Sequence, residues 1–202
     1  LAGQTYNGTY FQIALVRFTN SGILDSTFSN DGIFTYSPNA SVGCNAIALD
    51  ANGSIVVAGS SSFLGNGSDV SLFRVNSNGT LDLGFGGGDG HLETAVGAVS
   101  SALDVVIQSD GKIVVAGLTG DGTYNDFLVA RYNSGGFIDN TFDTDGIKSF
   151  SLAEYDDYAT SILQLASGKL LIGGFGATEF TLVRLNSNGA FDNTFGGDGI
   201  VL

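Results

Sequence analysis

The sequence contains very few cysteine and cationic residues. Cys44 is the only cysteine among 202 residues, which excludes an internal disulfide, a CxxC pair and a thiolate zinc site. Seven lysines and arginines stand against 20 aspartates and glutamates, and the formal net charge is −13. This charge would repel a phosphate backbone and an anionic bilayer. We therefore do not expect nucleic acid to be a partner.

Long hydrophobic segments are also lacking. No apolar run approaches the roughly 20 residues of a membrane-spanning helix, and no segment keeps a helical apolar period over about 10 residues. Leu1 begins within repeat sequence, with no signal-peptide pattern. The sequence does contain 31 glycines and 43% hydrophobic residues, a combination typical of short apolar strands separated by tight turns. The prediction is an all-β protein without membrane insertion.

The chain repeats itself about every 57 residues. All four arginines take one position of the repeat, at intervals of 57, 57 and 53 residues: Arg17, Arg74, Arg131 and Arg184. Each copy predicts four short strands, here called a to d. Strand a lies at 32–36, 91–92, 146–147 and 199–202, strand b at 46–49, 102–107 and 160–165, strand c at 1–3, 54–59, 112–117 and 169–174, and strand d at 11–18, 70–75, 127–132 and 180–185. The repeat units are 1–31, 32–89, 90–145 and 146–198, and 199–202 is expected to start the next blade.

Four-stranded antiparallel units repeated at one period fit the blades of a β-propeller. A β-solenoid would need shorter rungs, and a β-sandwich would not repeat at a single period. Strand c is an unbroken apolar run in each copy, which predicts burial on both of its faces. The sequence therefore predicts one β-propeller segment over residues 1–202.

The repeated motifs resemble a known family. In the third copy they read Asp-Gly-Lys-Ile-Val-Val-Ala-Gly at 110–117, Leu-Val-Ala-Arg-Tyr-Asn-Ser at 128–134, and Asp-Asn-Thr-Phe at 139–142 with Asp-Gly-Ile at 145–147. This pattern is similar to the delta-60 repeat, a bacterial β-propeller module of unassigned function. The resemblance covers essentially the whole chain. It implies a secreted or cell-surface bacterial protein whose other blades or domains are its neighbours, and it implies no catalytic residues.

The predicted strands at the two termini indicate an open structure. Residues 1–3 end a strand c and residues 199–202 form a strand a, so that joining them would give a blade without strand b. An incomplete blade exposes apolar edges, which soluble proteins avoid. We therefore expect an arc of a larger ring, with about seven or eight blades and a rotation of about 45–51° between neighbours.

An aspartate follows each arginine after eight residues. The pairs are Arg17 with Asp25, Arg74 with Asp82, Arg131 with Asp139, and Arg184 with Asp192. A guanidinium can bind a carboxylate through two parallel hydrogen bonds, so we expect a structural ion pair in each blade. A phenylalanine follows each aspartate after three residues, at Phe28, Phe85, Phe142 and Phe195. These rings are expected in the core between blades.

The sequence predicts no catalytic centre, cofactor or metal. His91 is the only histidine and takes a position that carries isoleucine in the other copies, and Cys44 has no histidine near it in sequence; neither is expected to act in catalysis. The acidic glycine turns at 143–146 and 86–90 resemble parts of calcium loops, but neither completes its pattern. Hairpin chemistry is the favoured explanation of these turns, and Ca²⁺ binding is kept as the alternative.

The connections between strands differ in how much they vary. The b–c turns and d–a connections keep their length, whereas the a–b loops (37–45, 93–101, 151–158) and the c–d loops (4–10, 60–69, 118–126, 175–179) change. In antiparallel blades the variable loops all emerge on one face, called here the variable-loop face; the opposite one is the turn face. Tyrosine is common in binding loops. The expected binding residues are Tyr6, Tyr36, Asn39, Tyr124, Asn125, Tyr155, Asp156, Asp157 and Tyr158, and the alternative is that the tyrosines merely cover loop backbone.

These features favour a non-enzymatic module for binding, adhesion or scaffolding in a secreted or cell-surface protein. A surface glycan or another surface protein is the expected ligand. The first alternative is an extracellular carbohydrate-active enzyme, a lyase or hydrolase, with Glu154, Asp156 and Asp157 as its carboxylates. A purely structural spacer is the second alternative.

Overall fold

A computed structural model describes residues 1–62, 67–152, 154–176 and 179–202. These residues form 16 strands, and no helix occurs among them, so the all-β prediction is confirmed. These ranges contain no helix that is long and apolar enough to cross a membrane. The parts of the variable loops at 63–66, 153 and 177–178 lie outside the described residues.

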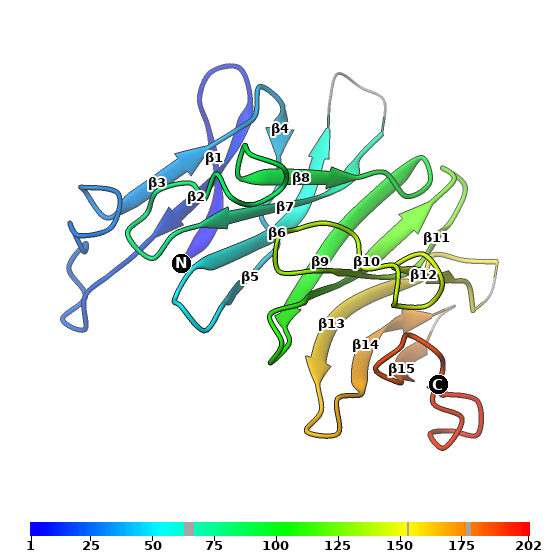
Figure 1. Ribbon diagram of the computed structural model, residues 1–202. Helices are drawn as coiled ribbons and strands as arrows, with labels where there is room; N and C mark the ends of the chain where they lie inside the picture. The colour runs from blue at the N-terminus through cyan, green and yellow to red at the C-terminus, as the bar shows by residue number, and fades with distance from the viewer. Residues whose placement is uncertain (63–66, 153, 177–178) are drawn as a thin grey trace.

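The strands form four antiparallel sheets that follow one another along an open arc (Figure 1). The first sheet contains β1 (Ala2–Tyr6), β2 (Phe11–Val16) and β3 (Ile33–Tyr36). In the second, β4 (Ser41–Val42) and β5 (Ala46–Leu49) both pair with β6 (Ile55–Ser62), and β7 (Asp69–Val75) and β8 (His91–Thr94) follow. In the third, β9 (Val99–Ile107) lies beside β10 (Ile113–Gly120), β11 (Asn125–Tyr132) and β12 (Ile147–Phe150). The fourth contains β13 (Tyr158–Gln164), β14 (Leu170–Gly176), β15 (Glu179–Leu185) and β16 (Ile200–Val201).

Strand a of each repeat unit completes the sheet of the preceding unit. β8 pairs with β7 and β12 pairs with β11, although both open a new repeat in the sequence. β16 likewise pairs with β15, with Ile200 opposite Val183. Residues 199–202 therefore complete the fourth sheet, where the sequence led us to expect the start of a further blade. The short d–a connection folds strand a back, antiparallel, against the strand d that precedes it in the chain. A repeat period alone does not reveal this pairing.

The central strands of the second and third sheets are buried on both sides. Val56 and Ala58 of β6 belong to the core between the second and third sheets, whereas Val57 packs in the core between the first and second. In β10, Val115 faces the second sheet and Val114 the fourth. The hydrophobic core thus lies in layers between consecutive sheets, which is the arrangement that the unbroken apolar runs predict.

The topology separates the two faces of the arc. The inner strands β5, β9 and β13 are neighbours in space, β9 lying against both of the others. The β1–β2 and β10–β11 connections lie on one side of the arc in Figure 1, and the β5–β6, β9–β10 and β13–β14 turns lie on the opposite side. The variable loops therefore share one face, as the antiparallel strand order requires.

The arginine of strand d connects its own sheet with the next one in each of the first three repeats. In Arg131, Nε donates to Asp139 Oδ2 at 2.8 Å, Nη2 to Thr141 Oγ1 at 3.0 Å, and Nη1 to the carbonyl of Ser187 at 2.6 Å. The guanidinium also lies over the ring of Phe142, 4.8 Å from its centroid. Because Ser187 belongs to the following repeat, one side chain holds strand d, the d–a connection and the next sheet together.

The same ion pair occurs in the other repeats. The Nε–Oδ2 distances are 2.9 Å for Arg17–Asp25, 2.6 Å for Arg74–Asp82 and 2.5 Å for Arg184–Asp192. The geometry differs from the expected pair of parallel hydrogen bonds, because the other guanidinium nitrogens bind a threonine hydroxyl or a backbone carbonyl. The arginine therefore distributes its donors over several elements instead of giving two to one carboxylate.

The aspartates of these pairs are held in the charged form. Burial raises the pKa of Asp139, but hydrogen bonds from Thr141 and Lys112 and the charge of Arg131 outweigh it, so that the pKa lies well below its usual value of 3.8. The hydrogen bond from Lys169 lowers the pKa of Asp192, and the hydrogen bond from Thr194 lowers it further. A carboxylate with a depressed pKa contributes stability above its unfolded-state pKa and loses it as the pH falls.

This linkage predicts the acid sensitivity of the fold. We expect the free energy of unfolding to change little between about pH 7 and 5 and to fall steadily below about pH 4. Asp139→Asn should make the free energy of unfolding fall less steeply with decreasing pH, because the variant has no carboxylate at residue 139 that could take up a proton. Urea unfolding at a series of pH values measures the slope, with exposed Asp110→Asn as the control for loss of one charge. An unchanged slope in Asp139→Asn would contradict the linkage.

Candidate functional site

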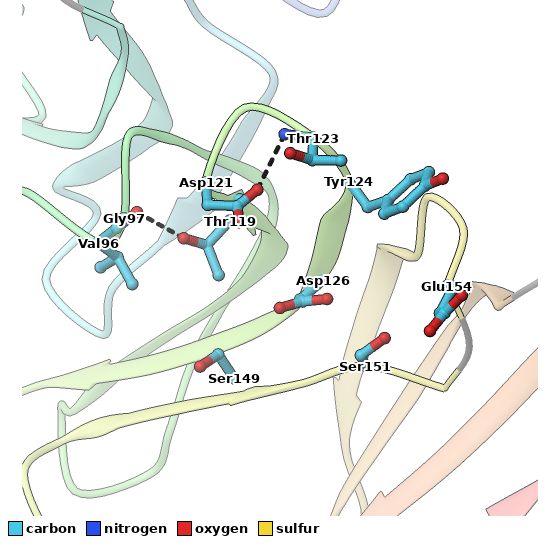
Figure 2. A pocket seen from close by; sticks show the side chains of 11 residues that line it. Val96, Gly97, Thr119, Asp121, Thr123, Tyr124, Asp126, Ser149, Ser151 and Glu154 are labelled. Carbon is cyan, nitrogen blue, oxygen red and sulfur yellow. Dashed lines mark hydrogen bonds between the residues drawn. The ribbon is translucent and has the colours of Figure 1, made fainter.

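A cleft opens on the variable-loop face of the third sheet (Figure 2). Its cavity of about 490 Å³ lies between the β8–β9, β10–β11 and β12–β13 connections. The polar lining consists of Thr119, Asp121, Thr123, Tyr124, Asp126, Ser149, Ser151 and Glu154. Among the described lining residues three carry carboxyl groups and none is basic. The cleft is thus hydroxyl-rich and acidic.

Strand register and loop contacts place one wall of the cleft. Thr119 and Asp126 are partners across β10 and β11, so their side chains share one face of the sheet. Thr119 Oγ1 donates to the carbonyl of Val96 at 2.5 Å and holds the β8–β9 connection against the sheet. Gly97 has a φ of +70°, and a Cβ there would lie 2.6 Å from the carbonyl oxygen of Gly120. This position therefore requires glycine, and the wall is closely packed.

The β10–β11 loop carries the exposed part of the cleft. Asp121 Oδ1 accepts a hydrogen bond from the backbone N–H of Thr123 at 2.8 Å, and this bond lowers the pKa of Asp121. Tyr124 stands at the rim in Figure 2. Its ring centroid lies 6.5 Å from that of Tyr155, and the two side chains are 46% and 57% exposed. An exposed aromatic pair therefore borders the acidic cleft.

The β12–β13 loop is attached to the same rim by hydrogen bonds. Asp156 Oδ1 accepts from the backbone N–H and from Nδ2 of Asn125, both at 2.9 Å. The backbone hydrogen bond from Asn125, followed by the one from Tyr158, lowers the pKa of Asp156. Asp157 is completely buried, and its carboxylate accepts from the backbone N–H of Leu152 at 2.6 Å. These contacts hold the second loop in place beside the tyrosines.

The structure brings together six of the nine residues expected in the binding loops. The six are Tyr124, Asn125, Tyr155, Asp156, Asp157 and Tyr158. Tyr6 and Asn39 belong to the first part of the arc: Tyr6 is 58% exposed and packs against Phe11, and Asn39 is an exposed residue with a φ of 62°. The clustered residues thus come from one pair of neighbouring loops.

Tyr36 occupies a different environment from the one expected of a loop tyrosine. Its ring lies 5.9 Å from that of Phe73 and 6.2 Å from that of His91, and it packs against the core between the first and second sheets. Tyr36 is the register partner of the buried Ile13, so its side chain faces the core although it ends a strand at the variable-loop face.

Most of the acidic and hydroxyl lining was not among the expected binding residues. Thr119, Asp126 and Ser149 each lie next to the last or first residue of their strands β10, β11 and β12. Asp121 lies in a loop from which only the tyrosine and asparagine were selected. A polar residue near the end of a strand beside a variable loop is the signal that could have identified them. Their convergence depends on strand register, which the sequence does not show directly.

The remaining residues considered for chemistry lie away from the cleft. The His91 ring stacks on Phe73 with centroids 5.7 Å apart. Burial raises the pKa of the Cys44 thiol to about 11, so the reactive thiolate is scarce at neutral pH. In the turn at 143–146, Asp143 accepts a hydrogen bond from Lys148 and Asp145 from the backbone of Ile147. No group of three or more His, Cys, Asp or Glu side chains among the described residues is arranged to hold a metal ion.

A protein-family model recognises three segments of the chain. The family is described as a domain of unknown function (DUF5122) beta-propeller, and its model matches residues 51–85, 108–142 and 165–195, which together make up half of the chain. Each segment contains strands c and d with the arginine–aspartate pair and ends at or beside the phenylalanine that packs under the arginine. No curated protein matches the chain.

Proposed function

Because the chain belongs to the DUF5122 β-propeller family, we propose that it is a non-enzymatic binding module whose ligand is a glycan held in the cleft on the variable-loop face. We further propose that the module acts in a secreted or cell-surface bacterial protein. One observation carries the proposal: the exposed Tyr124–Tyr155 pair borders a cleft that is lined by carboxylates and hydroxyls.

The chemistry of the cleft suits a sugar. Tyrosine rings offer flat apolar faces to the C–H side of a sugar ring together with a polar hydroxyl. Carboxylates accept hydrogen bonds from several sugar hydroxyls, and threonine and serine hydroxyls both donate and accept. A pocket that combines an apolar surface with a few converging polar groups is the usual form of a small-molecule site.

The charge of the cleft narrows the glycan class. Asp121, Asp126 and Glu154 line the cleft without a basic residue among the described lining, and the whole chain carries a net charge of −13. Uronic acids and sulfated sugars would be repelled, whereas neutral sugars and sugars with a free amine would not. We therefore propose a neutral or amine-bearing glycan.

Two of the three carboxylates considered for glycoside hydrolysis, Asp156 and Asp157, have contacts that suit binding better than hydrolysis. Hydrolysis requires one carboxylic acid that is protonated near the working pH and a second carboxylate across the sugar. Asp157 is buried and accepts a backbone hydrogen bond, and the pKa of Asp156 is lowered by its hydrogen bonds with Asn125 and Tyr158. Both carboxylates therefore support the conformation of the loop, which is a role that a binding site requires.

Alanine substitutions at the rim test the proposal. A glycan array followed by calorimetry on the best neutral or amine-bearing ligand should give binding that Tyr124→Ala and Tyr155→Ala each weaken by about tenfold, because each removes a stacking surface. Tyr6→Ala is the matched control, since Tyr6 is equally exposed but lies on the first sheet. Silence across the array, a preference for acidic glycans, or equal losses in Tyr6→Ala would refute the proposal.

A further inference from the structure

A second cavity lies on the turn face, between the second and third sheets. Its volume is about 600 Å³, and it opens between the β5–β6 and β9–β10 turns. Arg74 lines it together with the buried apolar side chains of Val56 and Ile113. Both sheets pack against a neighbouring sheet on each side, so the cavity belongs to the interior of the arc.

The corresponding cavity between the third and fourth sheets is smaller and contains a lysine and a threonine beside its arginine. Its volume is about 340 Å³, and Lys112, Arg131 and Thr141 line it. Lys112 Nζ lies 2.9 Å from Asp139 Oδ2. Thr141 Oγ1 donates to Asp139 Oδ1 at 2.7 Å and accepts from Arg131 Nη2 at 3.0 Å. An ammonium and a hydroxyl therefore hold the two oxygens of one carboxylate.

The second repeat lacks both of these side chains. Ser54 and Gly84 take the positions of the lysine and the threonine. Within the described residues, the Asp82 carboxylate accepts only from Arg74 Nε at 2.6 Å and from the backbone N–H of Gly84 at 2.9 Å. Nε and Nη1 of Arg74 are bonded, but none of the described residues accepts a hydrogen bond from its Nη2. The larger cavity therefore has an unused donor at Arg74 and unused acceptor capacity at Asp82.

Gln108 adds a polar group that has no partner among the described residues. It lies between the two cavities and lines both. The residue is only 7% exposed, yet its side-chain amide makes no hydrogen bond within the described part of the chain. A buried polar group normally has a hydrogen-bond partner. The amide, the free N–H of Arg74 and the open carboxylate of Asp82 therefore favour a polar ligand in the larger cavity.

We propose that the larger cavity binds a small amino alcohol whose amine and hydroxyl are on neighbouring carbons. The ligand's ammonium takes the place of the lysine ammonium at Asp82 Oδ2. Its hydroxyl donates to Asp82 Oδ1 and accepts from Arg74 Nη2, as the threonine does in the third repeat. Neighbouring carbons are required because both groups bind one carboxylate. An apolar substituent packs on Val56 and Ile113, and the net charge of −13 favours a cation over an anion.

Calorimetric titration of the 202-residue chain with leucinol tests the site. Leucinol is an amino alcohol of this kind with a branched apolar side chain. It should bind at least about tenfold more tightly than its analogue without the hydroxyl group and than its analogue without the amino group, because each loss leaves a polar group of the site unpaired. Tyr124→Ala should bind leucinol as the unchanged protein does, since Tyr124 belongs to the cleft on the opposite face.

Two variants fill the site with the side chains of the third repeat. Ser54→Lys and Gly84→Thr should each weaken leucinol binding about tenfold or more, because the chain itself then supplies the ammonium or the hydroxyl. The backbone of Gly84 is not in the left-handed region, so both variants should fold, which circular dichroism verifies. Ser167→Lys, at an exposed serine of the β13–β14 turn, is the control for added charge.

Four results would overturn the proposal. They are a failure of leucinol to bind at about 10 mM, equal binding of either analogue, unweakened binding in either of the two filled variants, and a loss of binding in Tyr124→Ala.

Discussion

Replacing Arg131 by alanine should lower the free energy of unfolding by about 3–5 kcal/mol. The Arg131 side chain is 6% exposed, and it binds Asp139, Thr141 and the carbonyl of Ser187 at once. Its loss leaves the Ser187 carbonyl without this donor and the largely buried Asp139 with Lys112 as its remaining basic partner. Urea unfolding followed by circular dichroism measures the change.

Arg17→Ala is the matched control for this prediction. Arg17 makes the corresponding bonds to Asp25, Thr27 and Ser77, but its side chain is 34% exposed. Water can therefore replace part of the hydrogen bonding that Arg17 provides, and Arg17→Ala should destabilise the protein clearly less than Arg131→Ala. If the two variants lose equal stability, burial is not what makes Arg131 important, and the proposed cause is wrong.

Gly117→Ala should destabilise the third sheet by about 3 kcal/mol or more. A Cβ at Gly117 would lie 1.9 Å from the carbonyl oxygen of Ser101 in the neighbouring strand β9, so backbone must move to admit a single methyl group. The equivalent Gly59 and Gly174 are as tightly packed, with a carbonyl oxygen at 2.0 Å and 1.9 Å from the added Cβ. Chemical unfolding of the single variant measures the loss.

The same repeat position in the first sheet provides the control. Gly3 lies in β1, and no atom lies within 4 Å of a Cβ built there. Gly3→Ala should therefore change stability by no more than about 0.5 kcal/mol. A comparable loss at Gly3 and Gly117 would indicate that the glycine of strand c is needed for a reason other than the close approach of strand b.

The features determined by the sequence alone are those that depend on local chemistry. Unbroken apolar runs such as 113–116, bounded by glycine turns, place the strands within a few residues of their observed limits, because short-range patterning specifies strands and turns. The repeated interval between Arg131 and Asp139 identified their ion pair, because one short connection brings the two side chains together in each unit. The period then indicated repeated blades.

The residues that line and border the cleft were predictable only in part. The tyrosines and acidic residues of the variable loops pointed to Tyr124, Tyr155 and Asp156, which do lie together. Tyr36 shows the limit of that reasoning, since its position in the register turns it toward Phe73 in the core. A residue's place in a loop or strand end does not reveal the direction of its side chain.

Only the tertiary structure decided how distant segments meet. The pairing of β16 with β15, the bond from Arg131 to the carbonyl of Ser187, and the convergence of Thr119, Asp121 and Glu154 on one cleft all join parts of the chain that lie far apart or have no shared motif. Such contacts depend on strand register and on the stacking of whole sheets, in which a shift of one residue turns every side chain to the other face. Local sequence preferences do not contain that information.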